Sequence, residues 1–356
     1  MRTAIIGLPQ TGKTSLFTIL TGAHQATRLG TLAARVGVAK VPDPRLDAVA
    51  AIFRPGKVTH ATIEYVDTPP ISKEALRDPG YLAGLRIVDA FAHVLRVFQD
   101  DRVPHELGSL DPVRDLEHVE TELILSDLAV AEKRLERLDK DRKKVKSQEL
   151  DQEAELLERV KAQLESGCPL RELPLGEEEE KRLRGFQFLS QKPMLWVLNL
   201  GEAEAPRLHE IEAEFRARAG QRPRTAITAV CGKIEAELSE LSPEEAQQYR
   251  ESFGLPDSGL QRLVEATFSL LGLISFFTGS QPEVRAWTVP RNTTALKAAG
   301  AIHSDFEERF IRAEVISWKD LVAAGSLAAA RERGLLRLEG RDYVVQDGDV
   351  LQIRHG

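Results

Sequence analysis

Short apolar segments alternate with amphipathic ones over the first 113 residues. The apolar segments at residues 3–6, 35–41, 62–66 and 90–98 have the length and composition of strands, and the last is apolar enough for a buried parallel strand. The segments between them place apolar residues at helical spacing. This alternation predicts an α/β fold with a mostly parallel sheet, helices on both faces and a ligand at the carboxyl ends of the strands.

The spacing is purely helical between residues 115 and 165. Leucine and valine recur there among many charges, with one polar interruption, which predicts two antiparallel helices forming a coiled-coil hairpin. The turn of this hairpin contains Lys140, Arg142, Lys143, Lys144 and Lys146. Because charged runs are usually solvated, we favour a solvated tip over a contact for RNA or an acidic partner.

The α/β pattern resumes after residue 192, with strands expected at residues 194–198 and 224–230. Beyond residue 272, short segments separated by glycine-containing turns predict a small α+β domain. Its expected elements are strands at residues 284–289, 310–316, 335–338, 343–345 and 350–353 and a helix at 294–299. We therefore divide the chain into an α/β domain (residues 1–114 and 186–271), a helical insertion (115–185) and a C-terminal domain (272–356).

The segment GLPQTGKT at residues 7–14 lies between the first expected strand and an amphipathic helix. It fits the phosphate-binding pattern G-x-x-x-x-G-K-[ST], in which backbone amides and a helix N-terminus surround the phosphates. We expect Lys13 to reach the β- and γ-phosphates and Thr14 to bind Mg²⁺. The expected phosphate-binding residues are Gly7, Pro9, Gln10, Thr11, Gly12, Lys13, Thr14 and Ser15. The motif in this setting predicts that the chain binds a nucleoside phosphate.

Asp67 ends the strand at residues 62–66, where a second acidic residue is expected to hold Mg²⁺ directly or through water. The segment Thr68-Pro69-Pro70 follows it. Nucleotide switches place a glycine amide at this point against the γ-phosphate, but Pro70 has no N–H group. The chain therefore lacks this donor.

Two later loops are candidates for binding the base. Asn199-Leu200-Gly201-Glu202 follows the strand at residues 194–198, and Cys231-Gly232-Lys233 follows the strand at residues 224–230. Guanine-specific proteins place an aspartate at the fourth position of the first loop, whereas Glu202 is one methylene longer. The expected base-binding residues are Asn199, Leu200, Glu202, Cys231, Gly232 and Lys233.

Composition narrows the protein class. The net charge of −7 gives no overall attraction to nucleic acid, so any such contact needs a local basic patch, and we do not expect sequence-specific DNA binding. The two cysteines, Cys168 and Cys231, are far apart and favour a reducing compartment. No long apolar segment is visible, so we expect a cytoplasmic protein without a membrane contact.

With these residues considered together, the chain resembles the YchF/Obg-like ATPase family, P-loop proteins of the TRAFAC class, over essentially its whole length. The most specific motifs are VPDPRLD at residues 41–47, Asn199-x-x-Glu202, KIEAEL at 233–238, VRAWT at 284–288, FIRAEVI at 310–316 and DYVVQDGDV at 342–350. The resemblance implies an OBG-type nucleotide-binding domain, a coiled-coil arm and a C-terminal TGS domain of β-grasp fold. It also implies slow ATP hydrolysis coupled to ribosome association and stress-linked regulation.

The resemblance adds further site residues. It implies that Thr31 closes on Mg²⁺ and that His105 assists the attacking water, although His105 also fits an exposed loop histidine. The family's potassium-binding asparagine is replaced by Gln10, so the resemblance leaves potassium dependence open. The family's Asp-x-Ala-Gly is also replaced by the segment that ends at Pro70, which should impair both discrimination between nucleotides and hydrolysis.

Three functions remain open from the sequence. The first is a Mg²⁺-dependent, weak ATPase that docks on ribosomal RNA and proteins, with Lys13 and His105 as catalytic residues and Thr14, Thr31 and Asp67 as metal ligands. The second is an adaptor that binds a nucleotide without hydrolysing it, which Pro69 and Pro70 favour over an efficient enzyme. The third is a GTPase in which Glu202 accepts guanine, although the Asn199-x-x-Glu202 loop favours ATP.

Overall fold

The computed structural model describes residues 1–22, 27–29, 34–255 and 257–356. These residues form two compact units. The first contains residues 1–38 and 64–266, and the second contains residues 39–63 and 267–356.

Seven of the described strands form the sheet of the first unit, in the order β2-β3-β5-β1-β6-β7-β8. The strands are β2 (Thr27–Leu29), β3 (Ala34–Lys40), β5 (Thr62–Asp67), β1 (Arg2–Ile6), β6 (Ala90–Arg96), β7 (Met194–Asn199) and β8 (Thr225–Val230). From β5 to β8 all neighbours are parallel, whereas β2 and β3 are antiparallel. The register pairs Ile5 with Asp67 and Arg96 with Asn199, so the loops that follow these strands meet at one edge.

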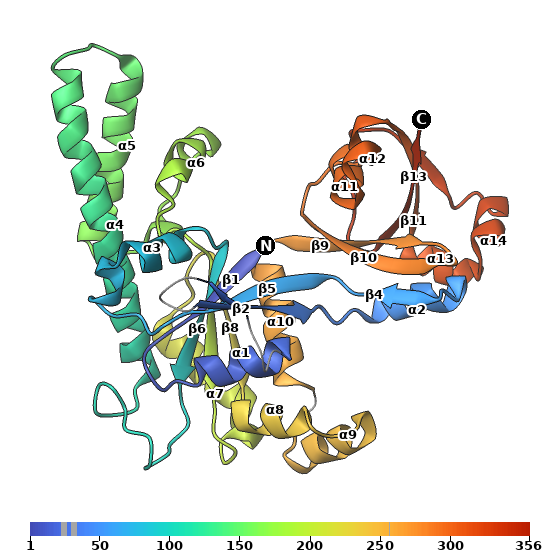
Figure 1. Ribbon diagram of the computed structural model, residues 1–356, viewed down its shortest axis with the longest axis horizontal. Helices are drawn as coiled ribbons and strands as arrows, with labels where there is room; N and C mark the ends of the chain where they lie inside the picture. Colours follow the sequence, from blue (N-terminus) through green and yellow to red (C-terminus); the bar gives the residue numbers. More distant parts are fainter. Residues whose placement is uncertain (23–26, 30–33, 256) are drawn as a thin grey trace. The chain divides into compact units, whose positions relative to one another are not determined.

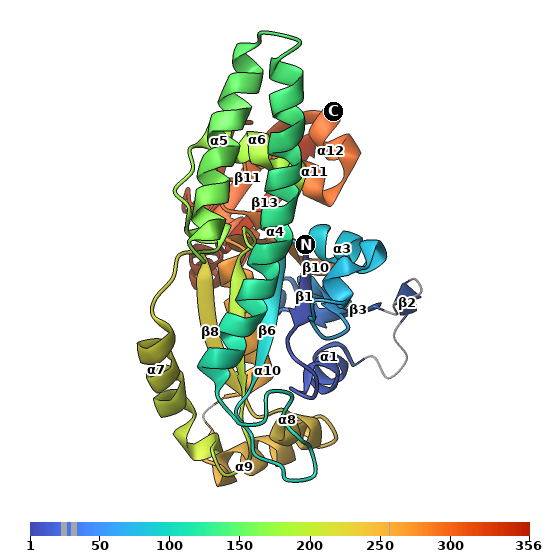
Figure 2. The same ribbon diagram turned by 90° about the vertical axis from the view of Figure 1, so that its left-hand side faces the viewer.

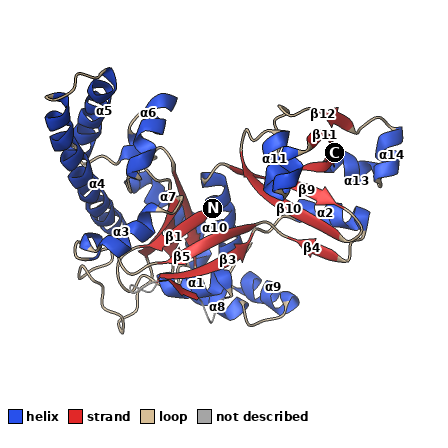
Figure 3. Ribbon diagram, turned by 45° about the horizontal axis from the view of Figure 1, so that its top comes forward, coloured by secondary structure: helices blue, strands red, loops and turns tan. Residues whose placement is uncertain are grey.

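Helices surround this sheet (Figure 3). They are α1 (Lys13–Thr21), α3 (Pro79–Arg86), α7 (Leu208–Ala219), α8 (Gly232–Leu238), α9 (Pro243–Ser252) and α10 (Gly259–Leu270), with short 3₁₀ helices η1 (Ala75–Arg77), η2 (Leu170–Glu172), η3 (Arg184–Phe186) and η4 (Ala205–Arg207). Apolar side chains of the strands and helices, such as Phe91, Trp196 and Leu208, form one buried core. The predicted α/β fold class is confirmed.

The predicted hairpin is formed by α4 (Pro112–Arg142) and α5 (Gln148–Glu165), which lie side by side in both Figure 1 and Figure 2. The short helix α6 (Glu177–Leu183) follows it. The seam between α4 and α5 buries alanine, leucine and valine, including Leu135, Leu138 and Leu157. Helix α4 begins before the predicted start because the Asp111 side chain accepts hydrogen bonds from the first-turn amides. Among the described residues, none of the helices combines the length and apolar character needed to cross a membrane.

Two buried polar contacts attach the base of the hairpin to the rest of the first unit. Glu120 on α4 pairs with Arg171 on η2, with Oε1 and Nη1 separated by 2.6 Å. Asp127, also on α4, accepts hydrogen bonds from the backbone amides of Leu189 and Ser190 at 2.9 and 2.7 Å. Because these groups are buried, the hairpin starts from a fixed base rather than from a flexible linker.

Six of the described strands form the sheet of the second unit, in the order β12-β11-β13-β9-β10-β4. They are β12 (Arg337–Glu339), β11 (Phe310–Ser317), β13 (Asp349–His355), β9 (Leu273–Gly279), β10 (Glu283–Pro290) and β4 (Lys57–Thr59). The helices are α2 (Pro44–Phe53), α11 (Ala295–Ile302), α12 (Ser304–Glu308), α13 (Trp318–Ala324) and α14 (Leu327–Glu332). Phe276, Val315 and Leu351 are among the residues of its buried core.

Residues 39–63 correct the predicted domain division, which assigned them to the α/β domain. Strand β4 pairs in parallel with β10 of the C-terminal segment. Arg45 at the start of α2 pairs with Asp347 at 2.7 Å. The apolar spacing of α2 looks like one more helix of the α/β alternation, but its partners lie more than two hundred residues later in the chain. Sequence order therefore misassigned this segment.

The C-terminal strands also differ from the prediction. Residues 343–345 are not a strand, because Val344 makes only an isolated bridge with Thr294. The Tyr343 hydroxyl instead donates to Asp349 at 2.8 Å. Strand β9 and helices α13 and α14 were not predicted. They are short, and tertiary pairing rather than local pattern defines them.

Candidate nucleotide-binding site

The segment between β1 and α1 adopts a loop that requires glycine. Gly7 and Gly12 have φ angles of 143° and 91°, which side chains rarely adopt. A Cβ at Gly7 would lie 2.6 Å from the carbonyl oxygen of Val94, and one at Gly12 would collide with the Asn199 amide. Helix α1 then begins at Lys13 with its first amides facing the loop. The loop therefore has the conformation that a phosphate group requires.

A cavity of about 510 Å³ lies over this loop. Its lining residues are Pro9, Gln10, Gly12, Lys13, Thr14, Ser15, Arg35, Asp67, Thr68, Pro69 and Pro70. The Lys13 ammonium donates to the carbonyl oxygen of Leu8, and its burial lowers the Lys13 pKa to about 8, although Asp67 partly offsets this. The structure thus brings most of the predicted phosphate-binding residues to one cavity, while Gly7 and Thr11 support the loop from outside the lining.

Thr14 and Asp67 meet at the edge of this cavity. The Thr14 hydroxyl donates to Oδ2 of Asp67 at 2.9 Å, and Nη2 of Arg35 lies 2.7 Å from the same oxygen. Oδ1 of Asp67 is buried and has no hydrogen-bond partner among the described residues. A carboxylate oxygen and a hydroxyl are ligands that Mg²⁺ prefers, so the residues present fit this ion. Thr31, the third predicted ligand, lies outside the described residues.

The segment after Asp67 offers few donors to a phosphate. Pro69 and Pro70 have no N–H group, and the next amide, of Ile71, donates to the carbonyl oxygen of Gly7 at 3.2 Å. The Thr68 hydroxyl donates to Ile5, and the Tyr81 hydroxyl donates to Pro69. The segment is therefore fastened to β1, to the phosphate loop and to α3.

The two predicted base-binding loops meet through Asn199. Its amide nitrogen donates to the carbonyl oxygen of Thr11 at 2.9 Å, and its amide oxygen accepts from the backbone N–H of Gly232 at 3.1 Å. Glu202 and Lys233 form an ion pair at 2.5 Å and are both solvent-accessible. Asn199 thus connects the phosphate loop to both base loops, while Glu202 and Lys233 remain open to a ligand.

Leu200 and Cys231 correct the predicted base-binding set. Each is only 2% exposed and belongs to the core of the first unit. Burial also raises the pKa of the Cys231 thiol. Loop position suggested a contact with the base, but the side chains of these residues point into the core and support the loops from below.

His105 lies outside the lining of the cavity. Its Nε2 atom lies 2.9 Å from Oδ2 of Asp115, and its Nδ1 atom accepts a hydrogen bond from the Leu107 amide at 3.1 Å. The imidazole is 7% exposed and is not among the residues that line the cavity. In this arrangement both nitrogens are engaged and the imidazole is nearly buried, so His105 is not an exposed loop histidine, and its predicted contact with the attacking water stays a prediction.

His93 is a buried residue that the sequence did not single out. It lies on β6 beneath Gly7, fully buried, and neither ring nitrogen has a hydrogen-bond partner among the described residues. Burial, with the nearby charges of Lys13 and Arg171, lowers its pKa to about 3. A histidine within an apolar strand gives no sequence signal of this kind.

Acidification should therefore destabilise the first unit through His93. The unfolded chain takes up a proton below a pKa of about 6.5, while the folded state stays neutral until about 3, so stability is lost as the pH falls below 6.5. Between pH 7 and pH 5 this loss amounts to about 2 kcal/mol. Denaturant unfolding measures it in a Trp287→Phe, Trp318→Phe background, in which Trp196 reports on the first unit.

Two variants control this measurement. His93→Leu should lose about 2 kcal/mol less than the parent between pH 7 and pH 5. His118→Leu, at an exposed position on α4, should lose as much as the parent. Equal pH dependence in the parent and in His93→Leu would contradict the assignment.

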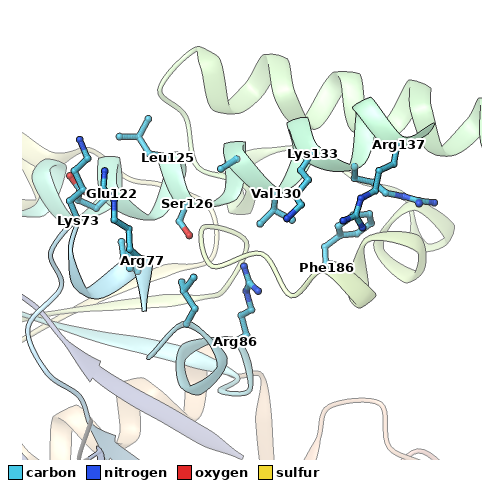
Figure 4. A pocket seen from close by; sticks show the side chains of 14 residues that line it. Lys73, Arg77, Arg86, Glu122, Leu125, Ser126, Val130, Lys133, Arg137 and Phe186 are labelled. Atoms are coloured by element: carbon cyan, nitrogen blue, oxygen red, sulfur yellow. The ribbon is translucent and has the colours of Figure 1, made fainter. Parts of the chain in front are cut away.

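A second cavity, of about 730 Å³, lies between α4 and the segment that contains η1 and α3. Figure 4 shows basic side chains from both sides lining it. Its described lining includes the cations Lys73, Arg77, Arg86, Lys133, Arg134 and Arg137, against one carboxylate, that of Glu122. We call the part of this cavity that these six cations line the basic groove. It was not predicted because its residues come from separate segments and none forms a run.

Known proteins resemble the chain over its whole length. It is 41% identical over 359 residues to "Ribosome-binding ATPase YchF" of Bacillus subtilis, covering 98% of each chain. It is 38% identical over 359 residues to the protein of that name in Escherichia coli O157:H7, covering 98% of this chain and 97% of the relative. Residues 273–356 match the family YchF-GTPase_C, described as a protein of unknown function (DUF933).

A solved structure matches the fold as well. The structure of the Schizosaccharomyces pombe YchF GTPase aligns with a TM-score of 0.83 and 26% identity, covering 99% of this chain and 97% of the other. The motifs, the phosphate loop and the full-length similarity agree. The chain belongs to the YchF family.

Proposed function

We propose that the chain is a Mg²⁺-dependent purine-nucleotide-binding protein with weak ATPase activity that docks on the ribosome. The observation that carries this proposal is the convergence of Lys13, Thr14 and Asp67 on one cavity above the glycine loop. The B. subtilis and E. coli relatives, whose names describe ribosome-binding ATPases, support it.

The proposed reaction is hydrolysis of the terminal phosphate. The oxygen of a water molecule bonds to the γ-phosphorus, the bond from this phosphorus to the β–γ bridging oxygen breaks, and ADP, inorganic phosphate and a proton result. Lys13 stabilises the negative charge on the phosphate oxygens, and Thr14 and Asp67 would hold Mg²⁺. When bound, the ion neutralises phosphate charge. We expect the rate to be low because Pro69 and Pro70 offer no amide to the γ-phosphate.

The same feature favours a second candidate function. If the segment after Asp67 neither donates to nor senses the terminal phosphate, the protein would bind a nucleotide without turnover and act as an adaptor. The fixed hydrogen bond from the Ile71 amide to Gly7 supports this alternative. Single-turnover hydrolysis measured beside a Lys13 variant separates the two functions.

The choice of base is a separate question, because the S. pombe protein is named a GTPase whereas the B. subtilis relative is named an ATPase. We expect ATP to displace a fluorescent nucleotide at a concentration roughly 10-fold or more below that of GTP.

Aspartate at position 202 would place a carboxylate where guanine donors reach it, so Glu202→Asp should shift the ratio towards GTP by roughly 10-fold. Glu210→Asp on α7 is the matched control. Displacement by GTP alone would contradict the ATP assignment.

The basic groove supports the ribosomal part of the proposal. Clustered cations bind RNA phosphates. Lys133 and Arg137 come from α4 of the hairpin, and Arg77 comes from η1. We therefore propose ribosomal RNA, with neighbouring ribosomal proteins, as the surface that the first unit contacts.

Reversing charge in the groove should weaken ribosome binding. We expect the combined change Arg77→Glu, Lys133→Glu and Arg137→Glu to lower the affinity for ribosomes in co-sedimentation by roughly 100-fold. The slope of log affinity against log salt concentration should also become shallower, by the equivalent of about 2 to 3 phosphate contacts. Lys140→Glu, Lys143→Glu and Lys144→Glu at the hairpin tip provide a charge-matched control with a small effect. A large loss in the tip variant, with none in the groove variant, would instead assign the contact to the tip.

A further inference from the structure

Arg35 is a second cation in the phosphate cavity. Among the described lining residues, Lys13 and Arg35 are the two that carry a positive charge. Arg35 comes from β3 rather than from the glycine loop, and its side chain is 27% exposed. Its guanidinium lies 5.3 Å from the centre of the buried Phe17 ring on α1. A cation–π contact of this kind keeps the group beside the cavity without using its N–H donors.

The partner of Arg35 is the residue expected to hold Mg²⁺. Nη2 of Arg35 lies 2.7 Å from Oδ2 of Asp67, the oxygen that also accepts from Thr14. A divalent cation and a guanidinium compete for one carboxylate because each disfavours the other at close range. When Asp67 and Thr14 hold the ion, Asp67 therefore has less attraction for Arg35, and the guanidinium is available to another anion.

The segment after Asp67 provides no hydrogen-bond donor for the terminal phosphate. Pro69 and Pro70, which line the same cavity as Arg35, have no N–H group, and the Ile71 amide is already bonded to Gly7. A terminal phosphate carries charge that a planar guanidinium matches with two parallel hydrogen bonds. Arg35 has both the position and the chemistry to replace the missing amide.

We propose that Arg35 recognises the terminal phosphate of the bound nucleotide, exchanging Asp67 for phosphate oxygens when the Mg²⁺–nucleotide complex enters the cavity. This inference rests on the proposed function, because it requires nucleotide binding at this site. It makes Arg35 the residue that distinguishes a triphosphate from a diphosphate, in place of the amide that the segment after Asp67 lacks.

The test compares the affinities for a non-hydrolysable ATP analogue and for ADP by calorimetry in Mg²⁺. Loss of charge-assisted hydrogen bonds to the terminal phosphate should lower the affinity of Arg35→Ala for the analogue by roughly 10- to 100-fold, with a change for ADP below about 3-fold. Arg35→Lys keeps the positive charge but loses the two parallel N–H donors of the guanidinium, so its affinity for the analogue should lie between those of Arg35→Ala and the wild-type protein. Arg216→Ala, at an exposed position on α7, should match the wild-type protein.

Magnesium supplies a second measurement that does not depend on hydrolysis. Arg35→Ala removes the guanidinium that competes with Mg²⁺ for Asp67. The Mg²⁺ concentration that gives half of each protein's maximal analogue binding should therefore be no higher in Arg35→Ala than in the wild-type protein. A parallel loss of analogue and ADP affinity, or an unchanged ratio in both Arg35→Ala and Arg35→Lys, would overturn the proposal. If wild-type binding does not depend on Lys13, the proposed function fails as well; if it does and the ratio is unchanged, only the role of Arg35 fails.

Discussion

Replacing Lys13 by alanine should lower single-turnover ATP hydrolysis by at least ~100-fold in the presence of Mg²⁺. Lys13 is the cation that the glycine loop holds inside the cavity, and catalysis of phosphoryl transfer depends on stabilising charge on the phosphate oxygens. The loss should appear with and without ribosomes and potassium, because Lys13 acts on the nucleotide itself. Rapid mixing with radiolabelled ATP measures the rate.

The loss should not come from unfolding. Burial disfavours the charge of Lys13, as its lowered pKa indicates, so its removal should leave the thermal midpoint unchanged or slightly raised. Lys181→Ala, on the exposed face of α6, is the matched control and should hydrolyse ATP at the wild-type rate. A Lys13→Ala rate equal to the wild-type rate would refute ATPase activity at this site, and tight nucleotide binding in the wild-type protein would then favour the adaptor.

Breaking the buried pair at the base of the hairpin should produce the largest loss of stability. The side chains of Arg171 and Glu120 are 0% and 4% exposed, and Glu120→Ala leaves the guanidinium buried without its counter-charge. Such a change costs about 3–5 kcal/mol in the free energy of unfolding, or roughly 6–20 °C in the thermal midpoint of a unit of this size. Denaturant unfolding reported by Trp196, with Trp287 and Trp318 replaced by phenylalanine, isolates the first unit.

A double variant separates charge pairing from packing. Oε2 of Glu120 and Nη2 of Arg171 have no hydrogen-bond partner among the described residues, so the pair itself is incompletely satisfied. Glu120→Leu combined with Arg171→Leu should therefore recover most of the stability that Glu120→Ala loses. Glu153→Ala, which removes the partner of the more exposed Arg134, should cost less than about 1 kcal/mol. A double variant that loses the sum of two single losses would show that packing, not charge, explains the effect.

Local rules were sufficient for much of the site. The glycines, Lys13 and Thr14 of the phosphate loop have set spacings within one strand–loop–helix unit, so the cavity could be predicted from eight residues. Asp67 followed because a strand that ends in an acidic residue beside that loop faces the same edge of a parallel sheet. The burial of Leu200 and Cys231 could not be predicted in this way, because loop position alone does not say where a side chain points.

The sequence by itself determined the α/β alternation, the phosphate loop, the helical hairpin and the family, because each of these depends on the local order and spacing of residues. Only the tertiary structure decided that residues 39–63 pack with the C-terminal unit, that Arg35 pairs with Asp67, that Glu120 meets Arg171, and that six scattered cations form one groove. These contacts join residues far apart in the chain. Charge and burial select such partners only after the backbone has brought them together, so spacing along the chain does not reveal them.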